Sequence, residues 1–438
     1  MKKPATRPTK PAALSVATSI FNRAGIVTIN MATGILTARM LHPAGRGELT
    51  AMNLWPLFLA NATALGTPSS LIYHLRKHAS RRGELIASAL TLVTALGCIA
   101  AIGGAVALPH WLGKYPPDVI HFAQLFLIVA PLWAIQITGQ AALEALELFS
   151  LSNTVQMMIP VTTLTSLLTF LALGRLTAIT AGASYAVAIV PTAVAILVML
   201  WRRRGSHLPR VNIAAWRTLL GYGVRSAPLD LMNTFNQYLD TVLVIGLLSA
   251  SSMGTYQVVL SLSRALLVIQ QAVVMVLFPK AAGKSIDTIL EMVGRSVRVG
   301  TIVTGSAALF AALVGPLLLG MLYGQDYLAA VPALRVLVTE VVVQGAVVVM
   351  AQAFMAVGRP GVVSTLQAIG LAVAVPLMFV FIPLYGTAGA ALALLCSTIT
   401  RFILIFFAIR IVLKKPLPRV VPGWADLLTL KRLVLRRG

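Results

Sequence analysis

Three apolar stretches of this sequence carry ionisable and amide side chains, and these residues offer the chemistry that needs explaining. In residues 13–38, Arg23, Asn30 and Thr37 follow one another at intervals of seven residues. Seven residues are close to two turns of an α-helix, so the three side chains would share one face. The guanidinium group of arginine is always charged and can fork onto a phosphate or a carboxylate. The stripe therefore suits an anionic ligand.

Two further stretches repeat this pattern. In residues 254–278, Arg264 lies seven residues from both Gln257 and Gln271. Residues 218–248 hold a denser polar set, in which positions 230, 233, 237 and 240 share one helical face: Arg225, Asp230, Asn233, Asn236, Gln237 and Asp240. Charges inside apolar surroundings are costly unless they are paired or solvated. We expect these three helices to line a cavity.

Pairing within the helices is the alternative to ligand binding. Arg225 could pair with Asp230, and Arg264 with Asp240, as purely structural contacts. Glu340 is apolar on both sides and fits either a carrier of a proton or cation, or a helix-packing hydrogen bond.

Enzymatic and metal chemistry have no counterpart in the sequence. The histidines show no metal-ligand spacing, and no glycine loop of the phosphate-cradling type occurs. We therefore expect no catalytic residues, no metal and no cofactor.

The composition indicates which environment the helices occupy. The chain of 438 residues is 58% hydrophobic and only 11% charged, with a mean hydropathy of +0.88. Soluble domains carry roughly 25% charged residues. Twelve apolar stretches are each long enough to cross a hydrocarbon core of about 30 Å: residues 13–38, 51–73, 85–109, 119–142, 151–173, 177–201, 218–248, 254–278, 298–322, 331–356, 361–383 and 387–412. The sequence predicts an all-α polytopic membrane protein.

The positive charge of the chain follows the expected membrane topology. The net charge is +23, and most of the 35 Lys and Arg residues lie in tails and connectors on the side of the N-terminus. Only five lie in connectors on the other side: Arg39, Arg46, Lys114, Arg175 and Arg335. Positive residues mark the cytoplasmic face, so both termini should be cytoplasmic and the charge should contact anionic lipid rather than nucleic acid.

A basic connector divides the spans into two sets of six. We expect a six-helix lobe at 13–201, a cytoplasmic linker at 202–217 and a second lobe at 218–412, between tails at 1–12 and 413–438. Six spans in each half give both halves the same orientation, as in transporters with parallel repeats.

Four short motifs in this chain resemble those of the oligosaccharide flippases. Residues 38–49 (ARMLHPAGRGEL) are similar to an Arg-x-Leu-Gly-Pro-x-x-x-Gly signature, with His42 in the place of its first glycine. Asp240 with the turn at 253–256 (MGTY), the turn at 322–327 (LYGQDY) and the helix entry at 385–391 (YGTAGAA) match further family patterns. These flippases belong to the multidrug/oligosaccharidyl-lipid/polysaccharide exporter superfamily.

The resemblance implies a function. It implies alternating access between two lobes, and transfer of an undecaprenyl-pyrophosphate-linked oligosaccharide from the cytoplasmic to the periplasmic leaflet of a bacterial inner membrane. It also implies partners among membrane lipids and polysaccharide-assembly proteins such as a polymerase and a chain-length regulator. Flippases of this superfamily carry cavity arginines on helices 1 and 8, where Arg23 and Arg264 fall here.

These implications assign roles to the polar residues. Three arginines would hold the pyrophosphate or acidic sugars: Arg23, Arg225 and Arg264. Five amides would contact the glycan or line the cavity: Asn30, Asn233, Asn236, Gln237 and Gln271. Three carboxylates are candidates for a coupling ion: Asp230, Asp240 and Glu340.

Two other functions compete with this one. A multidrug exporter of the same superfamily would pump cations and should show unpaired carboxylates, whereas here arginine occurs on all three polar helices. A membrane polysaccharide polymerase or glycosyltransferase would need a sizeable extramembrane loop, and the longest predicted connector is the basic segment 202–217.

Overall fold

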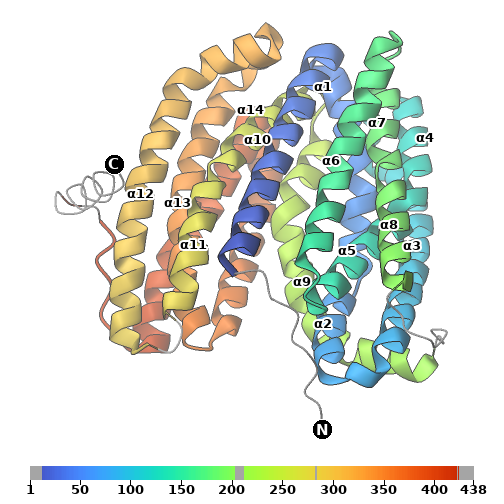
Figure 1. Cartoon of the computed structure of the whole chain (residues 1–438). Helices are drawn as coiled ribbons and strands as arrows, with labels where there is room; N and C mark the ends of the chain where they lie inside the picture. The colour runs from blue at the N-terminus through green and yellow to red at the C-terminus, as the bar shows by residue number, and fades with distance from the viewer. Residues whose placement is uncertain (1–11, 203–211, 282–283, 422, 424–438) are drawn as a thin grey trace. The chain divides into compact units, whose positions relative to one another are not determined.

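The structure, a computed structural model, describes residues 12–202, 212–281, 284–421 and 423. These residues form helices, and no β-strand occurs among them (Figure 1). The predicted all-α class is therefore confirmed. Nearly all of the predicted N-terminal tail, most of the basic linker and the end of the predicted C-terminal tail lie outside the described residues.

Helix lengths agree with the predicted number of membrane crossings. Within the described ranges, nine stretches are long and apolar enough to span a membrane. Two of them are pairs of helices joined by one non-helical residue: α1 (Ala12–Thr63) at His42, and α14 (Pro360–Ala408) at Gly386. The 35 residues of α9 (Ile213–Leu247) add another crossing. Together these make twelve.

The chain forms two compact units. Unit 1 is residues 1–234 and unit 2 is residues 235–438, so the boundary falls inside α9. Besides α1 and the first part of α9, unit 1 contains seven helices: α2 (Thr67–Lys77), α3 (Arg82–Trp111), α4 (Pro117–Phe126), α5 (Ala130–Ala145), α6 (Phe149–Ala172), α7 (Ala178–Val187) and α8 (Ile189–Arg202). The predicted lobe limits at 201 and 218 stay a prediction.

Close backbone contact attaches the first part of α9 to α2. A Cβ atom at Gly223 would lie 2.6 Å from the carbonyl oxygen of Leu65, nearer than real side chains approach. Ser70 also donates to the carbonyl oxygen of Leu219 at 2.9 Å. Glycine is needed at this crossing because any side chain would separate the two helices.

Unit 2 is built around α13 (Val331–Ala356). This helix packs against α14 and against three others: α10 (Ala250–Ala265), α11 (Leu267–Ala281) and α12 (Ile286–Leu318). A single turn residue, Leu266, separates α10 from α11, and its N–H bonds to the carbonyl oxygen of Ser263 at 3.1 Å. Arg264 lies in the last turn of α10, just before this residue.

Candidate functional site

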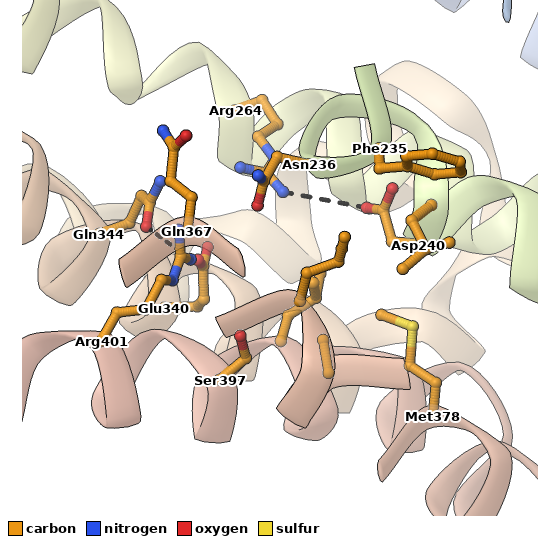
Figure 2. A pocket seen from close by; sticks show the side chains of 14 residues that line it. Phe235, Asn236, Asp240, Arg264, Glu340, Gln344, Gln367, Met378, Ser397 and Arg401 are labelled. Atoms are coloured by element: carbon orange, nitrogen blue, oxygen red, sulfur yellow. Dashed lines mark hydrogen bonds and ion pairs between the residues drawn. The ribbon is translucent and has the colours of Figure 1, made fainter. Parts of the chain in front are cut away.

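A cavity of about 90 Å³ lies within unit 2 and is lined by charged and amide side chains. Its walls come from α9, α10, α13 and both halves of α14 (Figure 2). The lining residues recur at helical spacing, so each helix contributes one face: Phe235, Asn236, Leu239, Asp240, Arg264, Glu340, Gln344, Gln367, Leu371, Ala374, Met378, Leu394, Ser397 and Arg401.

An ion pair between two predicted site residues forms part of the wall. The nearest guanidinium nitrogen of Arg264 lies 3.9 Å from Oδ2 of Asp240, whose side chain is only 4% exposed. The same Oδ2 accepts a hydrogen bond of 3.3 Å from the Tyr256 hydroxyl, and Oδ1 accepts one of 2.8 Å from the Thr241 N–H. Asp240 is thus held firmly by its neighbours, while its contact with Arg264 is long for a charge-assisted bond, which is typically 2.7–2.9 Å.

A second charged cluster faces this pair across the cavity (Figure 2). Thr398 donates from its hydroxyl to Oε1 of Glu340 at 2.7 Å and accepts from Nη2 of Arg401 at 2.9 Å. The same Nη2 donates to Oε1 of Gln344 at 2.9 Å. Two atoms have no hydrogen-bond partner among the described residues, namely Oε2 of Glu340 and Nε of Arg401. A buried group in this state is costly, so the cluster can gain by binding a proton or a polar group.

The sequence analysis missed much of this cluster. It assigned no site role to Gln344, Gln367, Ser397 or Arg401, all of which line the cavity. The available signals were the one-turn spacing from Glu340 to Gln344, and the presence of a cation in the otherwise apolar last span.

Charge is balanced in the cavity wall. Among the described lining residues, the two arginines are matched by two carboxylates: Arg264 and Arg401 with Asp240 and Glu340. Unit 2 alone therefore does not form the strongly cationic cavity that the sequence predicted.

Other predicted site residues occupy different surroundings in unit 2. Gln237 and Gln271 are exposed and do not line the cavity. Gln237 donates to the Tyr238 hydroxyl at 3.1 Å. Gln271 lies on α11, seven residues after Arg264 and past the single turn residue Leu266.

The remaining predicted site residues belong to unit 1. Arg23, Asn30, Arg225 and Asn233 are all exposed within it. Asp230 is half-buried and accepts a hydrogen bond of 3.2 Å from the Ser69 hydroxyl. Across the described ranges, no ion pair joins Arg225 to Asp230. The shared cavity of Arg23, Arg225 and Arg264 stays a prediction.

In the described part of the chain, no three histidine, cysteine, aspartate or glutamate side chains are grouped so that they could hold a metal ion.

Comparison with known families gives an extended match. A model of the family described as polysaccharide biosynthesis proteins matches residues 36–332, well over half of the chain. No curated protein matches the sequence significantly.

Solved structures resemble the chain over nearly its whole length. The lipid II flippase MurJ in an inward closed conformation matches with a TM-score of 0.76 and 13% identity, covering 91% of this chain and 88% of that one. An inward-facing multidrug resistance MATE transporter of the MOP superfamily matches with a TM-score of 0.73 and 14% identity, covering 89% and 94%. A MOP superfamily transporter from Pyrococcus furiosus gives a TM-score of 0.59 and 14% identity, covering 92% and 96%. The chain therefore shares their fold.

Proposed function

Since the chain belongs to the polysaccharide biosynthesis protein family, we propose that it is a flippase for a lipid-linked oligosaccharide. The cargo would be an oligosaccharide on undecaprenyl pyrophosphate, moved from the cytoplasmic to the periplasmic leaflet of a bacterial inner membrane. The observation that carries this proposal is the polar, charged cavity inside a membrane-spanning unit, at Asp240 and Arg264. A pyrophosphate crossing hydrocarbon needs cationic groups that offset its lost hydration.

Arginines are assigned to the pyrophosphate. Arg264 is one-third exposed and its contact with Asp240 is long, so its guanidinium group has donors to offer an entering phosphate. Arg23 and Arg225 are exposed within unit 1 and would add positive charge that the unit 2 cavity lacks. Alternating access of two lobes, with both termini cytoplasmic, would carry the head group across while the lipid tail stays in the bilayer.

Amide side chains are assigned to the glycan. Amides both donate and accept hydrogen bonds, as sugar hydroxyls do. Asn236 lines the cavity, and the structure adds Gln344 and Gln367 to it. We also assign to the glycan the other four predicted amides, all of which are exposed: Asn30, Asn233, Gln237 and Gln271.

Carboxylates are assigned to energy coupling. Asp230 and Asp240 stay candidates for a coupling ion, and Glu340 has the most distinctive setting of the three. Its side chain is 2% exposed, and its Oε2 atom is buried without a hydrogen-bond partner. A proton is small enough to neutralise that atom without rearranging the surrounding helices.

An exporter of cationic compounds is the second candidate. Asp240 and Glu340 in the cavity wall favour it, because carboxylates attract cations. Arg264 and Arg401 oppose it, since both guanidinium groups line the same small space.

Leaflet localisation of the lipid-linked sugar tests the proposal. A strain lacking the gene is complemented with wild type, with Arg264→Glu or with Arg335→Glu, which reverses an exposed charge of unit 2 outside the cavity. We expect the intermediate to accumulate on the cytoplasmic face, and wild type and Arg335→Glu alone to clear it. Normal crossing without the gene, in a strain with no redundant flippase, would refute the function. Efflux of a cationic dye that depends on the gene would support the exporter instead.

A further inference from the structure

A chain of hydrogen bonds runs between α5 and α6 of unit 1. Gln136 donates to Gln140 at 3.0 Å, and Gln140 donates to Oε1 of Glu144 at 3.1 Å. Ser152 donates to the same Oε1 at 3.1 Å, and Gln156 lies 3.5 Å from the Ser152 hydroxyl. We call these five residues the α5–α6 ladder. Its α5 part runs from Gln136 to Glu144, about 12 Å along the helix.

The ladder is more polar than helix packing requires. Glu144 lies at the end of α5, but Gln136 and Gln140 lie further along the predicted span 119–142, where each polar group is costly. The bond from Ser152 to Glu144 would alone suffice to join the helices. Gln136 and Ser152 are buried, at 6% and 2% exposure, whereas Gln140, Glu144 and Gln156 are only half-buried. Gln140, Glu144 and Gln156 are therefore partly accessible.

Hydrogen-bonding capacity remains on these three residues. Oε2 of Glu144 and Oε1 of Gln156 form no hydrogen bond within the described residues. Gln140 has a second amide hydrogen and a second lone pair to offer. The ladder thus presents donors and acceptors together.

This combination selects a class of ligand. A pyrophosphate offers only acceptors and would be repelled by the Glu144 carboxylate. A lipid tail offers neither donors nor acceptors. Sugar hydroxyls both donate and accept, so they match the remaining groups.

The ladder also adjoins the helix that carries Arg23. The Asn22 amide of α1 donates to the backbone carbonyl of Asn153 on α6 at 3.1 Å. A Cβ atom at Gly25 would lie 2.7 Å from Cε of Met157, so α1 and α6 are tightly packed there. Arg23 is exposed on this part of α1. A pyrophosphate held by Arg23 would bring its first sugars to the neighbourhood of the ladder.

We propose that the α5–α6 ladder is a binding site for the sugar units nearest the pyrophosphate of the cargo. This inference rests on the proposed flippase function. It assigns recognition of the glycan to unit 1 as well as to the cavity of unit 2.

Binding of two lipids to the purified full chain in nanodiscs tests the site. The probes are the undecaprenyl-pyrophosphate-linked oligosaccharide extracted from the strain lacking the gene, and undecaprenyl pyrophosphate without sugar. The variants are Gln140→Leu and, at the weakly bonded end of the ladder, Gln156→Leu. The matched control is Gln124→Leu, which removes a half-buried amide of unit 1 that bonds to the Ala105 carbonyl outside the ladder.

We expect both ladder variants to bind the glycosylated lipid about 5- to 10-fold more weakly, the loss of roughly one hydrogen bond. Binding of the bare lipid should not change, and the control should bind both lipids as wild type does. Equal weakening for both lipids, or no change for either, would overturn the sugar site and leave the flippase function standing. If wild type binds neither lipid, the flippase function itself falls, and the sugar site falls with it.

Discussion

The side chain of Arg401 lies directly on the bare backbone of Gly370, so that a Cβ atom at Gly370 would collide with Cδ of the arginine. The Ser397 hydroxyl donates a hydrogen bond of 2.7 Å to the Gly370 carbonyl, which holds the two halves of α14 together at this point. We predict that Gly370→Ala folds, because a flexible side chain can yield, but displaces Arg401 from Gln344 and Thr398. Displacement of about 1 Å can lower activity by up to about 100-fold. Transport in a complemented deletion strain measures the effect.

Gly361→Ala is the matched control for that change. It lies on the same helix, and a Cβ atom there would meet nothing within 4 Å. Wild-type transport in both variants would show that the position of Arg401 is unimportant.

Loss of Asp240 should lower stability. Asp240→Asn removes the carboxylate that forms an ion pair with Arg264 in a largely buried place. Breaking a fully buried pair costs about 3–5 kcal/mol; because Arg264 is one-third exposed, we expect about 1–3 kcal/mol. Thermal unfolding in detergent measures this, and the double variant Asp240→Asn/Arg264→Gln should recover part of the loss.

An exposed ion pair gives the comparison. Asp287 is 67% exposed and lies 2.7 Å from Lys415, so Asp287→Asn should cost less than about 1 kcal/mol. If Asp240→Asn lowers the free energy of unfolding no more than Asp287→Asn does, the Asp240–Arg264 pair does not stabilise the protein.

His42 occupies a backbone conformation that favours glycine. Its φ of 56° and ψ of 176° fall in a region that side chains rarely adopt, at a cost of about 1–3 kcal/mol. His42→Gly should therefore stabilise the protein by about 1 kcal/mol once the greater freedom of glycine in the unfolded chain is subtracted. His121 is exposed and lies within helix α4, so His121→Gly should instead lower the stability by about 0.5–1 kcal/mol. A lower melting temperature for both variants would contradict this account.

The turn at His42 also shows why the flippase motifs contain glycine at particular positions. The flippase signature has glycine at this position, and the structure supplies the reason in the positive φ. Gly324 and Gly386, in two other motifs, likewise have positive φ, at 114° and 58°. Sequence reasoning nevertheless started the second span at residue 51, because the polar residues from Gly45 to Glu48 read as a loop. The helix in fact resumes directly after His42.

Acid should destabilise the end of α2 through His74. Burial lowers the pKa of its imidazole, and the neighbouring charges of His78, Lys77 and Arg81 lower it further. The ring lies beside Tyr73 and Tyr222, and neither of its nitrogens has a hydrogen-bond partner among the described residues.

The direction of the pH effect follows from that lowered pKa. The unfolded chain takes up the proton first, at a pKa near 6.5, so stability is full above that pH and falls as the pH drops through it. His74→Gln should flatten the fall in melting temperature between pH 7.5 and 5.5, whereas His121→Gln should leave it unchanged. If the melting temperature of His74→Gln falls with pH as steeply as that of wild type, His74 does not cause the acid destabilisation.

The candidate site was predictable only in part. Helical periodicity identified Asp240, and the seven-residue stripe identified Arg264, because both signals lie within one segment. Of the predicted face at 230, 233, 237 and 240, only Asp240 lines the cavity, together with Phe235, Asn236 and Leu239 of the same helix. Apolar members of a cavity wall give no signal in a search for polar stripes.

Contacts between distant segments explain the rest. Thr398 bridges Glu340 and Arg401, and Glu340 and Thr398 are separated by 58 residues. No local spacing encodes that meeting, because it depends on how α13 packs against α14. Glu144 and Ser152 are a shorter-range case, since the turn between α5 and α6 brings them together from two helices.

The matched charges in the unit 2 cavity have an evolutionary consequence. With two carboxylates and two guanidinium groups in the wall, one replacement sets the sign of the field inside. An amide in place of Asp240 or Glu340 leaves an excess positive charge that attracts anions, and an amide in place of Arg264 or Arg401 leaves the opposite. A lineage with this scaffold could therefore exchange acidic for basic cargo in one mutational step, without altering a helix.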